Sequence, residues 1–330
     1  MQITSLVTGG AGFIGSHVAQ HLLKLNHRVI VLDDLSGGFK ENIPQEVIFI
    51  EGSITDETLV KDTFKKYSFD YVYHLAAYAA EGLSHFIRKF NYENNLIGSI
   101  NLINASVNHN IKRFIFTSSI AVYGAQELPL KESQKPRPED PYGIAKYAVE
   151  QDLENAQKMF GLDYIIFRPH NVYGPGQNIG DKYRNVVGIF MNQLLKNEAL
   201  TIFGDGEQTR AFTYIDDVAP YIASSYAFAK AKNQLFNIGS DVHNTVNHLA
   251  LEVGKAMRKE TKITHLDSRE EVVHAYSDHT KFKEIFSLTQ ETPLSEGLAK
   301  TALWVQQHGA RESSIFDTIE IKKNLPKSWQ

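Results

Sequence analysis

The chain opens with Ile3-Thr4-Ser5-Leu6-Val7-Thr8-Gly9-Gly10-Ala11-Gly12-Phe13-Ile14-Gly15, an apolar strand-like run that leads into a glycine-rich turn. Gly9, Gly12 and Gly15 have the spacing G-x-x-G-x-x-G, and helical periodicity follows directly. Such glycines allow a tight turn, close approach to a pyrophosphate and close packing of helix on sheet. The stretch therefore predicts a dinucleotide-binding turn, with the helix N-terminus facing the phosphates.

The second apolar run, residues 28–33, ends at Asp33, 18 residues after Gly15. A carboxylate at this place accepts hydrogen bonds from a ribose diol and repels a 2′-phosphate, which favours NAD over NADP. Asp34 is an alternative holder of this role, and a solvent-facing turn aspartate is the competing interpretation. Lys40 lies nearby and would weaken the discrimination.

Short β-branched runs alternate with helical patterns through the first half of the chain. We expect strands at residues 3–8, 28–33, 47–51, 70–76, 113–119 and 164–168, and helices at residues 14–26, 56–66, 86–110 and 142–160. Continuous apolar strands that alternate with helices predict a parallel sheet covered on both faces, and right-handed crossovers make it doubly wound. The fold class is α/β, of the Rossmann type.

After Pro169 the rhythm loosens, and residues 171–184 form a loop rich in Gly, Pro and Asn. Further helices are expected at residues 186–196, 215–229 and 294–308, and further strands at residues 200–204, 235–239 and 261–267. We expect an NAD-binding domain over residues 1–170, to which residues 211–240 return. Residues 171–330 then form a smaller, discontinuous substrate-binding lobe.

Composition excludes several functional classes. The 330 residues carry a net charge of −4 with both signs scattered, which does not suggest a nucleic-acid groove or a polybasic membrane surface. The chain has no cysteine, so disulfides, thiolate nucleophiles and cysteine zinc sites are excluded, and no metal site is expected. No apolar stretch approaches the roughly 20 residues of a membrane helix, and no signal-peptide order opens the chain. A cytoplasmic protein without membrane or nucleic-acid partners is expected.

Ser119, Tyr142 and Lys146 form the candidate catalytic group. Ser119 ends the buried strand run, and Tyr142 and Lys146 lie four residues apart at the start of a predicted helix, on one helical face. A phenol beside an ammonium group, near a nicotinamide, is suited to removing a hydroxyl proton while a hydride leaves the same carbon. A packed aromatic residue at a helix start is the competing interpretation for Tyr142.

Several motifs extend this pattern over nearly the whole chain. They are His74-Leu75-Ala76-Ala77, Thr117-Ser118-Ser119, Val122-Tyr123-Gly124, Tyr142-x-x-x-Lys146, Arg168-Pro169-His170-Asn171-Val172-Tyr173-Gly174, Gly204-Asp205-Gly206-Glu207-Gln208-Thr209-Arg210 and Tyr214-Ile215-Asp216-Asp217-Val218. With these motifs in this order, the chain resembles the extended short-chain dehydrogenase/reductase family. The resemblance is strongest to its NAD-dependent nucleotide-sugar epimerases of the UDP-glucose 4-epimerase type.

The resemblance implies a role for each reactive residue. Tyr142 takes the proton of the sugar hydroxyl, which requires its pKa to fall by up to ~3 units from about 10. Lys146 favours the phenolate and binds the nicotinamide ribose, while Ser119 hydrogen-bonds the reacting oxygen. The residues expected around the cofactor are Gly9, Gly12, Phe13, Ile14, Gly15, Asp33, Asp34, Ser53, Ile54, Leu75, Ala76, Ala77, Asn95, Thr117, Tyr142, Lys146 and Pro169.

Departures from other branches of the family narrow the expected reaction. Sugar 4,6-dehydratases carry an Asp-Glu pair, and nucleotide-sugar decarboxylases a glutamate, in the stretch where this chain has Ser119, Ile120 and Ala121. The cysteine of GDP-mannose 3,5-epimerases is also missing. What remains is 4-epimerisation, or a related epimerisation that needs only Ser119, Tyr142 and Lys146, and the resemblance implies UDP-glucose and UDP-galactose as the sugars. The alternatives are another nucleotide-sugar oxidoreductase of this fold and a non-catalytic NAD-binding regulator.

On the substrate side, the resemblance places Asn171, Arg210 and Arg269 at the nucleotide-sugar diphosphate, together with Ser119 and Tyr142 at the sugar. A small residue at Ala275 implies that N-acetylated UDP-hexosamines are accepted as well. The loop at residues 78–86 is a candidate specificity loop, and residues 313–330 suggest a surface tail without an assigned role.

The resemblance also implies a homodimer. The contact would be formed by the long helix before Arg113 and the helix that carries Tyr142, and Leu96, Ile100 and Ile103 suit either this contact or core burial.

Overall fold

A parallel β-sheet forms the centre of the molecule. The computed structural model describes residues 2–181, 185–268, 272–288, 290–311 and 319–326. In this part of the chain seven strands pair in the order β11-β6-β5-β4-β1-β2-β3, and all pairs are parallel. They are β1 (Thr4–Thr8), β2 (Arg28–Asp33), β3 (Ile48–Glu51), β4 (Tyr71–His74), β5 (Arg113–Thr117), β6 (Tyr164–Pro169) and β11 (Gln234–Ile238).

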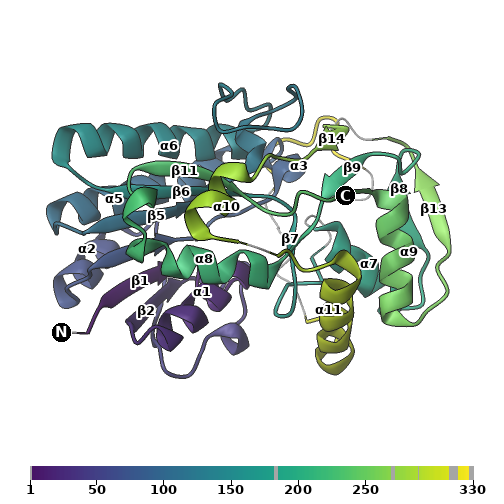
Figure 1. Ribbon diagram of the computed structural model, residues 1–330, viewed down its shortest axis with the longest axis horizontal. Helices are drawn as coiled ribbons and strands as arrows, with labels where there is room; N and C mark the ends of the chain where they lie inside the picture. The colour runs from purple at the N-terminus through teal and green to yellow at the C-terminus, as the bar shows by residue number, and fades with distance from the viewer. Residues whose placement is uncertain (1, 182–184, 269–271, 289, 312–318, 327–330) are drawn as a thin grey trace.

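Helices cover both faces of this sheet (Figure 1). One face carries α2 (Glu57–Lys66), α5 (Gly98–Asn108) and α6 (Pro141–Phe160), and the other carries α1 (Phe13–Lys24) and α8 (Ala219–Ser224). Successive side chains of a strand point to opposite faces, so Leu6 packs with the first helical layer and Val7 with the second. The predicted doubly wound α/β fold is confirmed.

The strand order reverses between β1 and β4. From β1 the chain builds outward to β2 and β3, then returns to β4 on the other side. The carboxyl ends of the strands at such a reversal are where doubly wound sheets bind ligands. The glycine turn after β1 lies at this place.

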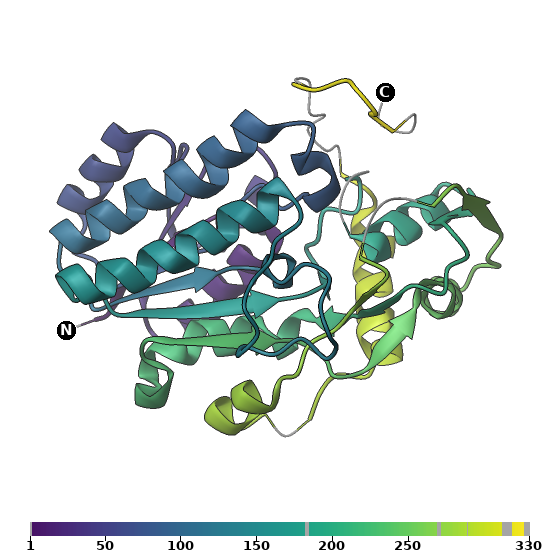
Figure 2. The same cartoon turned by 90° about the horizontal axis from the view of Figure 1, so that it is seen from above.

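The second half of the chain places a smaller set of elements beside the main sheet, beyond the carboxyl ends of its strands (Figure 2). Its helices are α7 (Val186–Leu195), α9 (Val246–Met257) and α11 (Leu294–His308). Its strands are β7 (Val172–Tyr173), β8 (Leu200–Phe203), β9 (Thr209–Ala211), β10 (Thr213–Tyr214), β12 (His243–Thr245), β13 (Ile263–Leu266) and β14 (His274–Ala275). One continuous hydrophobic cluster joins Val7 and Val31 to Phe190, Val253 and Leu298. A domain division at residue 170 stays a prediction, although β11 does return to pair with β6.

Two predicted helices are wrong in part. The predicted helix at residues 86–110 consists of α4 (Arg88–Tyr92), a π-helical turn (Glu93–Ile97) and α5, and α3 (Glu81–Ser84) forms within the preceding loop. The predicted helix at residues 215–229 is broken into a 3₁₀ turn (Ile215–Asp217), α8 and another 3₁₀ turn (Ser225–Ala227). Pro220 explains the break before α8, because a residue without an amide hydrogen is accepted in the first turn of a new helix.

Other boundaries differ by a few residues. The strands predicted at residues 70–76 and 113–119 end earlier, at His74 and Thr117, which leaves their last residues free to form the site. Helices α9 and α10 (Thr280–Phe286) have no counterpart among the predicted elements.

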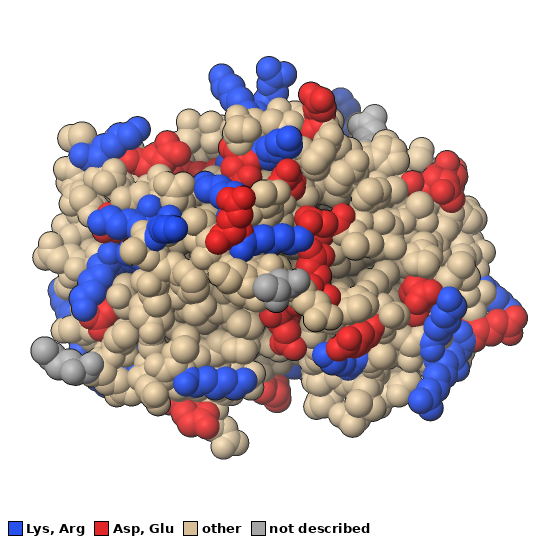
Figure 3. Space-filling model, viewed as in Figure 1, with Lys and Arg blue, Asp and Glu red and all other residues tan. Residues whose placement is uncertain are grey.

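The surface mixes charges of both signs. Lys and Arg side chains alternate with Asp and Glu side chains over the face shown in Figure 3. Within the described residues no helix is both long enough and apolar enough to cross a membrane.

Candidate active site

The turn after β1 has a backbone that requires glycine. Gly9 has a φ of +73°, and a Cβ there would lie 2.6 Å from the Ala76 nitrogen. A Cβ at Gly15 would lie 2.0 Å from the Gly9 oxygen, so this glycine lets α1 pack against the turn. Phe13 and Ile14 form the first turn of α1, and no side chain caps the helix at Gly12. The uncapped amides suit an anion such as the predicted pyrophosphate.

Asp33 braces this turn. Its Oδ2 accepts a hydrogen bond from the Ala11 amide at 2.9 Å, and its Oδ1 accepts one from the Leu35 amide at 2.8 Å. Burial raises the pKa of the carboxyl, and the two amides act in the opposite direction. An ionised carboxylate has about four acceptor positions, so it can brace the turn and bind a ribose together. Asp34 instead accepts from the Ser36 amide in an exposed turn, which favours Asp33 for the predicted ribose contact.

The nicotinamide side of the predicted pocket follows β4. Leu75, Ala76 and Ala77 continue from this strand past Gly9, and all three are partly buried. Asn95, in the π-helical turn, accepts from the Tyr78 amide at 2.8 Å and donates to the Tyr78 carbonyl at 3.1 Å. Asn95 therefore fixes the backbone that follows Ala77.

The remaining cofactor candidates lie at the ends of neighbouring strands. Ser53 Oγ lies 2.9 Å from the Thr55 hydroxyl, and Ile54 packs against Gly98. Pro169 is buried at the end of β6. The Thr117 hydroxyl is buried at the end of β5 without a hydrogen-bond partner. The uncapped amides of α1, the carboxylate of Asp33 and this orphaned hydroxyl fit a dinucleotide.

Lys146 lies at the centre of the predicted catalytic group and is fully buried. Its Nζ donates to the Thr117 carbonyl at 2.9 Å and lies 5.8 Å from the centroid of the Tyr142 ring. Burial lowers the pKa of Lys146 to about 7, and the negative charge of Glu150 acts in the opposite direction. A cation beside a phenol favours the phenolate.

Close backbone packing brings Ser119 to the start of α6. The Ser119 hydroxyl accepts from the Ala121 amide at 3.1 Å and begins a 3₁₀ turn. A Cβ at Gly143 would lie 2.6 Å from the Ala121 oxygen, so a glycine is needed for α6 to approach this turn. Asp140 caps α6 by accepting from the Gly143 amide at 2.9 Å. The structure thus places Ser119, Tyr142 and Lys146 together at the carboxyl end of β5.

A buried ion pair below Lys146 was not predicted from the sequence. Glu150 lies one turn beyond Lys146 on α6, and its Oε1 accepts from Arg168 Nε at 2.9 Å and from Ser118 Oγ at 2.5 Å. Arg168 Nη2 donates to the second oxygen, and both side chains are 3% exposed. The spacing of Tyr142, Lys146 and Glu150 at every fourth residue is the signal that marks Glu150 as a member of this group.

The predicted substrate residues are placed as follows. Asn171 has a φ of +41° and donates to the Ala211 carbonyl at 3.2 Å. The Arg210 guanidinium donates to the Val273 carbonyl at 2.8 Å and to the Val272 carbonyl at 2.6 Å, which ties β9 to the residues directly before β14. Arg269 lies outside the described residues. A phosphate contact by Asn171 or Arg210 stays a prediction.

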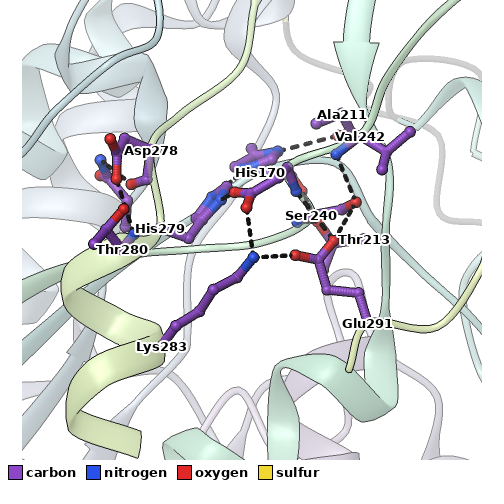
Figure 4. A network of polar contacts seen from close by, with 12 residues as sticks. His170, Ala211, Thr213, Ser240, Val242, Asp278, His279, Thr280, Lys283 and Glu291 are labelled. Atoms are coloured by element: carbon purple, nitrogen blue, oxygen red, sulfur yellow. Dashed lines mark hydrogen bonds and ion pairs between the residues drawn. The ribbon is translucent and has the colours of Figure 1, made fainter. Parts of the chain in front are cut away.

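His170 links these substrate residues to a buried polar network (Figure 4). Its Nδ1 lies 3.0 Å from the Ala211 carbonyl, which only accepts, so Nδ1 carries the proton. Burial lowers the pKa of His170 to about 3, so the ring is neutral and its Nε2 accepts from His279 Nε2 at 2.9 Å. The Ala211 carbonyl therefore accepts hydrogen bonds from both His170 and Asn171.

The far end of this network is charged. His279 Nδ1 lies 2.6 Å from Asp241 Oδ1, and this hydrogen bond, with Lys283, lowers the pKa of the Asp241 carboxyl to about 2. Lys283 Nζ also contacts Glu291, 2.6 Å from its Oε1. The network anchors the backbone around Asn171 to α10.

Among the described residues no group of three or more His, Asp or Glu side chains is arranged to hold a metal ion. His74 belongs to the motif His74-Leu75-Ala76-Ala77 and has a structural role. Its two ring nitrogens are both hydrogen-bonded, at 2.8 Å from Thr8 Oγ1 and 2.8 Å from Ser99 Oγ.

Known proteins resemble this chain in sequence and in overall fold. Residues 5–239 match the model of the NAD dependent epimerase/dehydratase family. A putative UDP-glucose 4-epimerase of Methanocaldococcus jannaschii is 34% identical over 92% of this chain and 98% of its own length.

Solved structures agree in fold over the same extent. A Thermotoga maritima UDP-glucose 4-epimerase with UDP-glucose superimposes with a TM-score of 0.88 at 36% identity, over 92% of this chain and 99% of that chain. A UDP-N-acetylglucosamine 4-epimerase of Methanobrevibacter ruminantium has a TM-score of 0.87 at 32% identity, over 93% and 99%. The glycine turn, the grouped Ser119, Tyr142 and Lys146 and these matches lead to one conclusion: the chain belongs to the NAD dependent epimerase/dehydratase family.

Proposed function

We propose that this protein is an NAD-dependent epimerase that inverts C4 of a nucleotide sugar, with UDP-glucose and UDP-galactose as the principal pair. The observation that carries the proposal is the group of Ser119, Tyr142 and Lys146 at the carboxyl end of β5, close to the glycine turn. The relatives that are named UDP-glucose 4-epimerases support this choice of sugar.

Each side chain has one task in this reaction. Tyr142 removes the proton of the 4-hydroxyl, and the Lys146 ammonium stabilises the phenolate that this requires. Ser119 donates a hydrogen bond to the reacting oxygen as it becomes a carbonyl. Bound NAD supplies the acceptance and return of the C4 hydride. Return of the proton from Tyr142 completes an isomerisation without net oxidation, so no added oxidant is required.

The absence of a carboxylate at residues 119–121 argues against the dehydratase and decarboxylase reactions of the family. Elimination of water or loss of CO₂ requires an additional acid or base that this stretch does not supply. A net oxidoreductase is a weaker candidate. Asp33 braces a turn suited to NAD, and in the proposed epimerisation the hydride taken from C4 is returned to the same sugar, so the cofactor need not be exchanged.

N-acetylated UDP-hexosamines are the second substrate pair that we propose. Ala275 on β14 lies in register with Arg210 on β9, so a small side chain stands beside a predicted phosphate ligand. The M. ruminantium relative is named for UDP-N-acetylglucosamine. A small residue here leaves room for a C2 acetamido group.

Product analysis by NMR tests the function. Purified protein is incubated separately with UDP-glucose, UDP-GlcNAc and UDP-glucuronate, without and with added NAD. We expect the C4 epimer from UDP-glucose, and a kcat lowered on the order of 10²- to 10⁴-fold in Tyr142→Phe. No epimer under either condition, or undiminished turnover by Tyr142→Phe, would refute the proposal.

A homodimer through α5 and α6 remains part of this proposal. Ile103 is buried in the protomer core. Apolar surface is presented by Ile97 (51% exposed), directly before α5, and by Met159 (67%) and Phe160 (66%) at the end of α6. Light scattering after gel filtration should give twice the protomer mass for the wild-type protein. The variant Ile97→Asp should have a lower mass, because a charge is placed in the contact. A monomeric wild-type protein would contradict it.

A further inference from the structure

The C-terminal segment lies over the loop that follows the nicotinamide side of the site. Residues 319–326 contact α3 and the start of α4, and Figure 2 shows this yellow segment apart from α11. The backbone amides of Glu320 and Ile321 both donate to the Phe86 carbonyl, at 2.9 Å and 3.1 Å. Two parts of the chain more than 200 residues apart in sequence thus share one hydrogen-bonded contact.

Glu320 supplies the cap that α4 lacks. No side chain at Ile87 caps this helix. The Glu320 carboxylate accepts from the Lys89 amide at 2.8 Å and from the Phe90 amide at 2.9 Å, one oxygen for each. An anion at a helix N-terminus satisfies amides that have no partner within the helix and interacts favourably with the helix dipole.

Apolar contacts hold the same segment down. Ala80, Leu83 and Ile87 form a small buried cluster separate from the main cores, and Ile319 and Leu325 pack against it. The C-terminal segment therefore supplies part of the hydrophobic cover of this loop.

The covered loop reaches directly from the glycine turn to Tyr142. At one end, Ala76 lies against Gly9, and Asn95 holds the following Tyr78. At the other end, the Tyr142 amide donates to Ser84 Oγ at 3.3 Å. Residues 78–87 thus connect the cofactor turn and the proposed base.

The start of α4 is tied to the same helix turn. Asn91 Nδ2 donates to the Pro141 carbonyl at 2.8 Å, one residue before Tyr142. A shift of α4 therefore changes the relation between this loop and the first turn of α6.

A second anchor lies on the other side of the glycine turn. Arg311 donates to Asn42 Oδ1 at 2.9 Å and stacks 3.7 Å above the Phe39 ring. Phe39 and Asn42 both donate to the Ala11 carbonyl. Arg311 and Glu320 therefore attach the end of the chain on both sides of the dinucleotide turn.

We propose that residues 319–326 are a positioning element of the sugar side of the site. Through Glu320 they fix the start of α4, and through Ile319 and Leu325 they hold residues 78–87 at the distance from Tyr142 that accommodates the sugar of a nucleotide sugar. The proposal rests on the proposed function for the identity of this ligand. Its physical core, the attachment of the loop by Glu320, is independent of turnover.

Hydrogen exchange and binding measured on the full chain test this proposal. Glu320→Gln keeps the shape of the side chain but removes its charge and one of its two acceptor oxygens. Loss of a helix cap predicts exchange of the amides at residues 88–91 that is faster on the order of fivefold to tenfold. Calorimetric titration should show weaker binding of UDP-glucose, by about threefold or more, with unchanged binding of UDP, because the proposal assigns the loop to the sugar and not to the nucleotide.

Two further variants sharpen the result. Lys322→Gln changes an exposed charge in the same segment and should match the wild type in both measurements. A chain that ends at Arg311 should reproduce the effects of Glu320→Gln. Unchanged exchange at residues 88–91 in both Glu320→Gln and the shortened chain would overturn the proposal, and so would equal weakening of UDP and UDP-glucose. Failure of the proposed function has a different signature, since the wild type then forms no epimer while Glu320→Gln still accelerates exchange.

Discussion

Replacing Glu150 by Gln should destabilise the protein strongly, because it leaves a buried guanidinium without its counter-ion. Arg168 and Glu150 are each 3% exposed, and both carboxylate oxygens accept from the guanidinium. In Glu150→Gln, an amide NH₂ group faces an Arg168 N–H, so one hydrogen bond is replaced by two opposed donors. Arg168 Nη1 already has no partner, so little compensation is available.

The magnitude follows from the burial of the pair. Removing one partner of a buried ion pair costs about 3–5 kcal/mol. The entropy of unfolding of a 330-residue chain is about 0.7 kcal/mol/K, from ~2.1 cal/mol/K per residue. The melting temperature should therefore fall by about 4–7 °C.

Differential scanning calorimetry measures this shift, with Glu154→Gln as the matched control. Glu154 is one turn further along α6 and is exposed, so its replacement should change the melting temperature by less than about 1 °C. The double variant Glu150→Leu with Arg168→Met removes both charges and should recover much of the loss. A melting temperature for Glu150→Gln equal to that of Glu154→Gln would refute the reasoning.

The same substitution has a second consequence in the site. The Glu150 charge raises the pKa of Lys146, so its removal moves this pKa further down. The alkaline limb of the pH profile of turnover, where Lys146 loses its proton, should move toward lower pH in Glu150→Gln and stay in place in Glu154→Gln. An unshifted profile would show that Glu150 acts on the fold alone.

Two further predictions concern acid stability and the start of α6. Burial lowers the pKa of His170 to about 3. Below pH ~6.5 the unfolded chain therefore binds a proton at this residue that the folded chain does not. The free energy of unfolding should fall by about 2 kcal/mol between pH 6.5 and pH 5. Urea unfolding at both pH values should show this loss in the wild type and a smaller one in His170→Gln, which can still donate to Ala211 and accept from His279; equal losses would contradict it. Asp140→Ala removes the cap of α6 and should cost about 1 kcal/mol and also lower kcat, since Tyr142 lies in the first turn. The control Asp56→Ala removes the equivalent cap of α2, remote from Tyr142. It should lower the free energy of unfolding by the same amount and leave kcat unchanged. An equal loss of kcat in both variants would argue against a role of Asp140 in positioning Tyr142.

The elements that the sequence predicts well are those whose signal is local. The glycine turn and the run ending at Asp33 lie within 33 residues, and β2 has the predicted bounds. The π-helical turn at Glu93–Ile97 has no such signal, because its cause is tertiary. Within this turn, the Asn95 side chain is hydrogen-bonded to both the amide and the carbonyl of Tyr78. Composition and periodicity cannot reveal such a contact.

The supporting contacts of the site were missed for the same reason. Ser84 reaches Tyr142 across 58 residues, and His170 reaches His279 across 109. The sequence places Ser119 and Tyr142 near each other only through motif order. In the structure, the proximity of Ser119 and Tyr142 depends on Gly143, which lets α6 approach the Ala121 carbonyl. It also depends on the helix cap that Asp140 supplies.

The face of α6 that carries the reactive residues changes its chemistry from one turn to the next. Tyr142, Lys146 and Glu150 are each four residues apart, about 6 Å along the helix axis. Tyr142 lies at the N-terminal end, where its amide donates to Ser84. The Lys146 ammonium group lies at the end of β5, and the Glu150 carboxylate is paired with Arg168 on β6. Arg168 offsets the negative charge that Glu150 would otherwise present to Lys146. Burial lowers the pKa of Lys146 and the charge of Glu150 opposes this effect, so the carboxylate raises the protonated share of Lys146 near neutral pH, where the proposed role of Tyr142 needs a neighbouring cation. We therefore expect the ion pair to act in the proposed reaction by balancing the charge beside Lys146, in addition to its role in the fold.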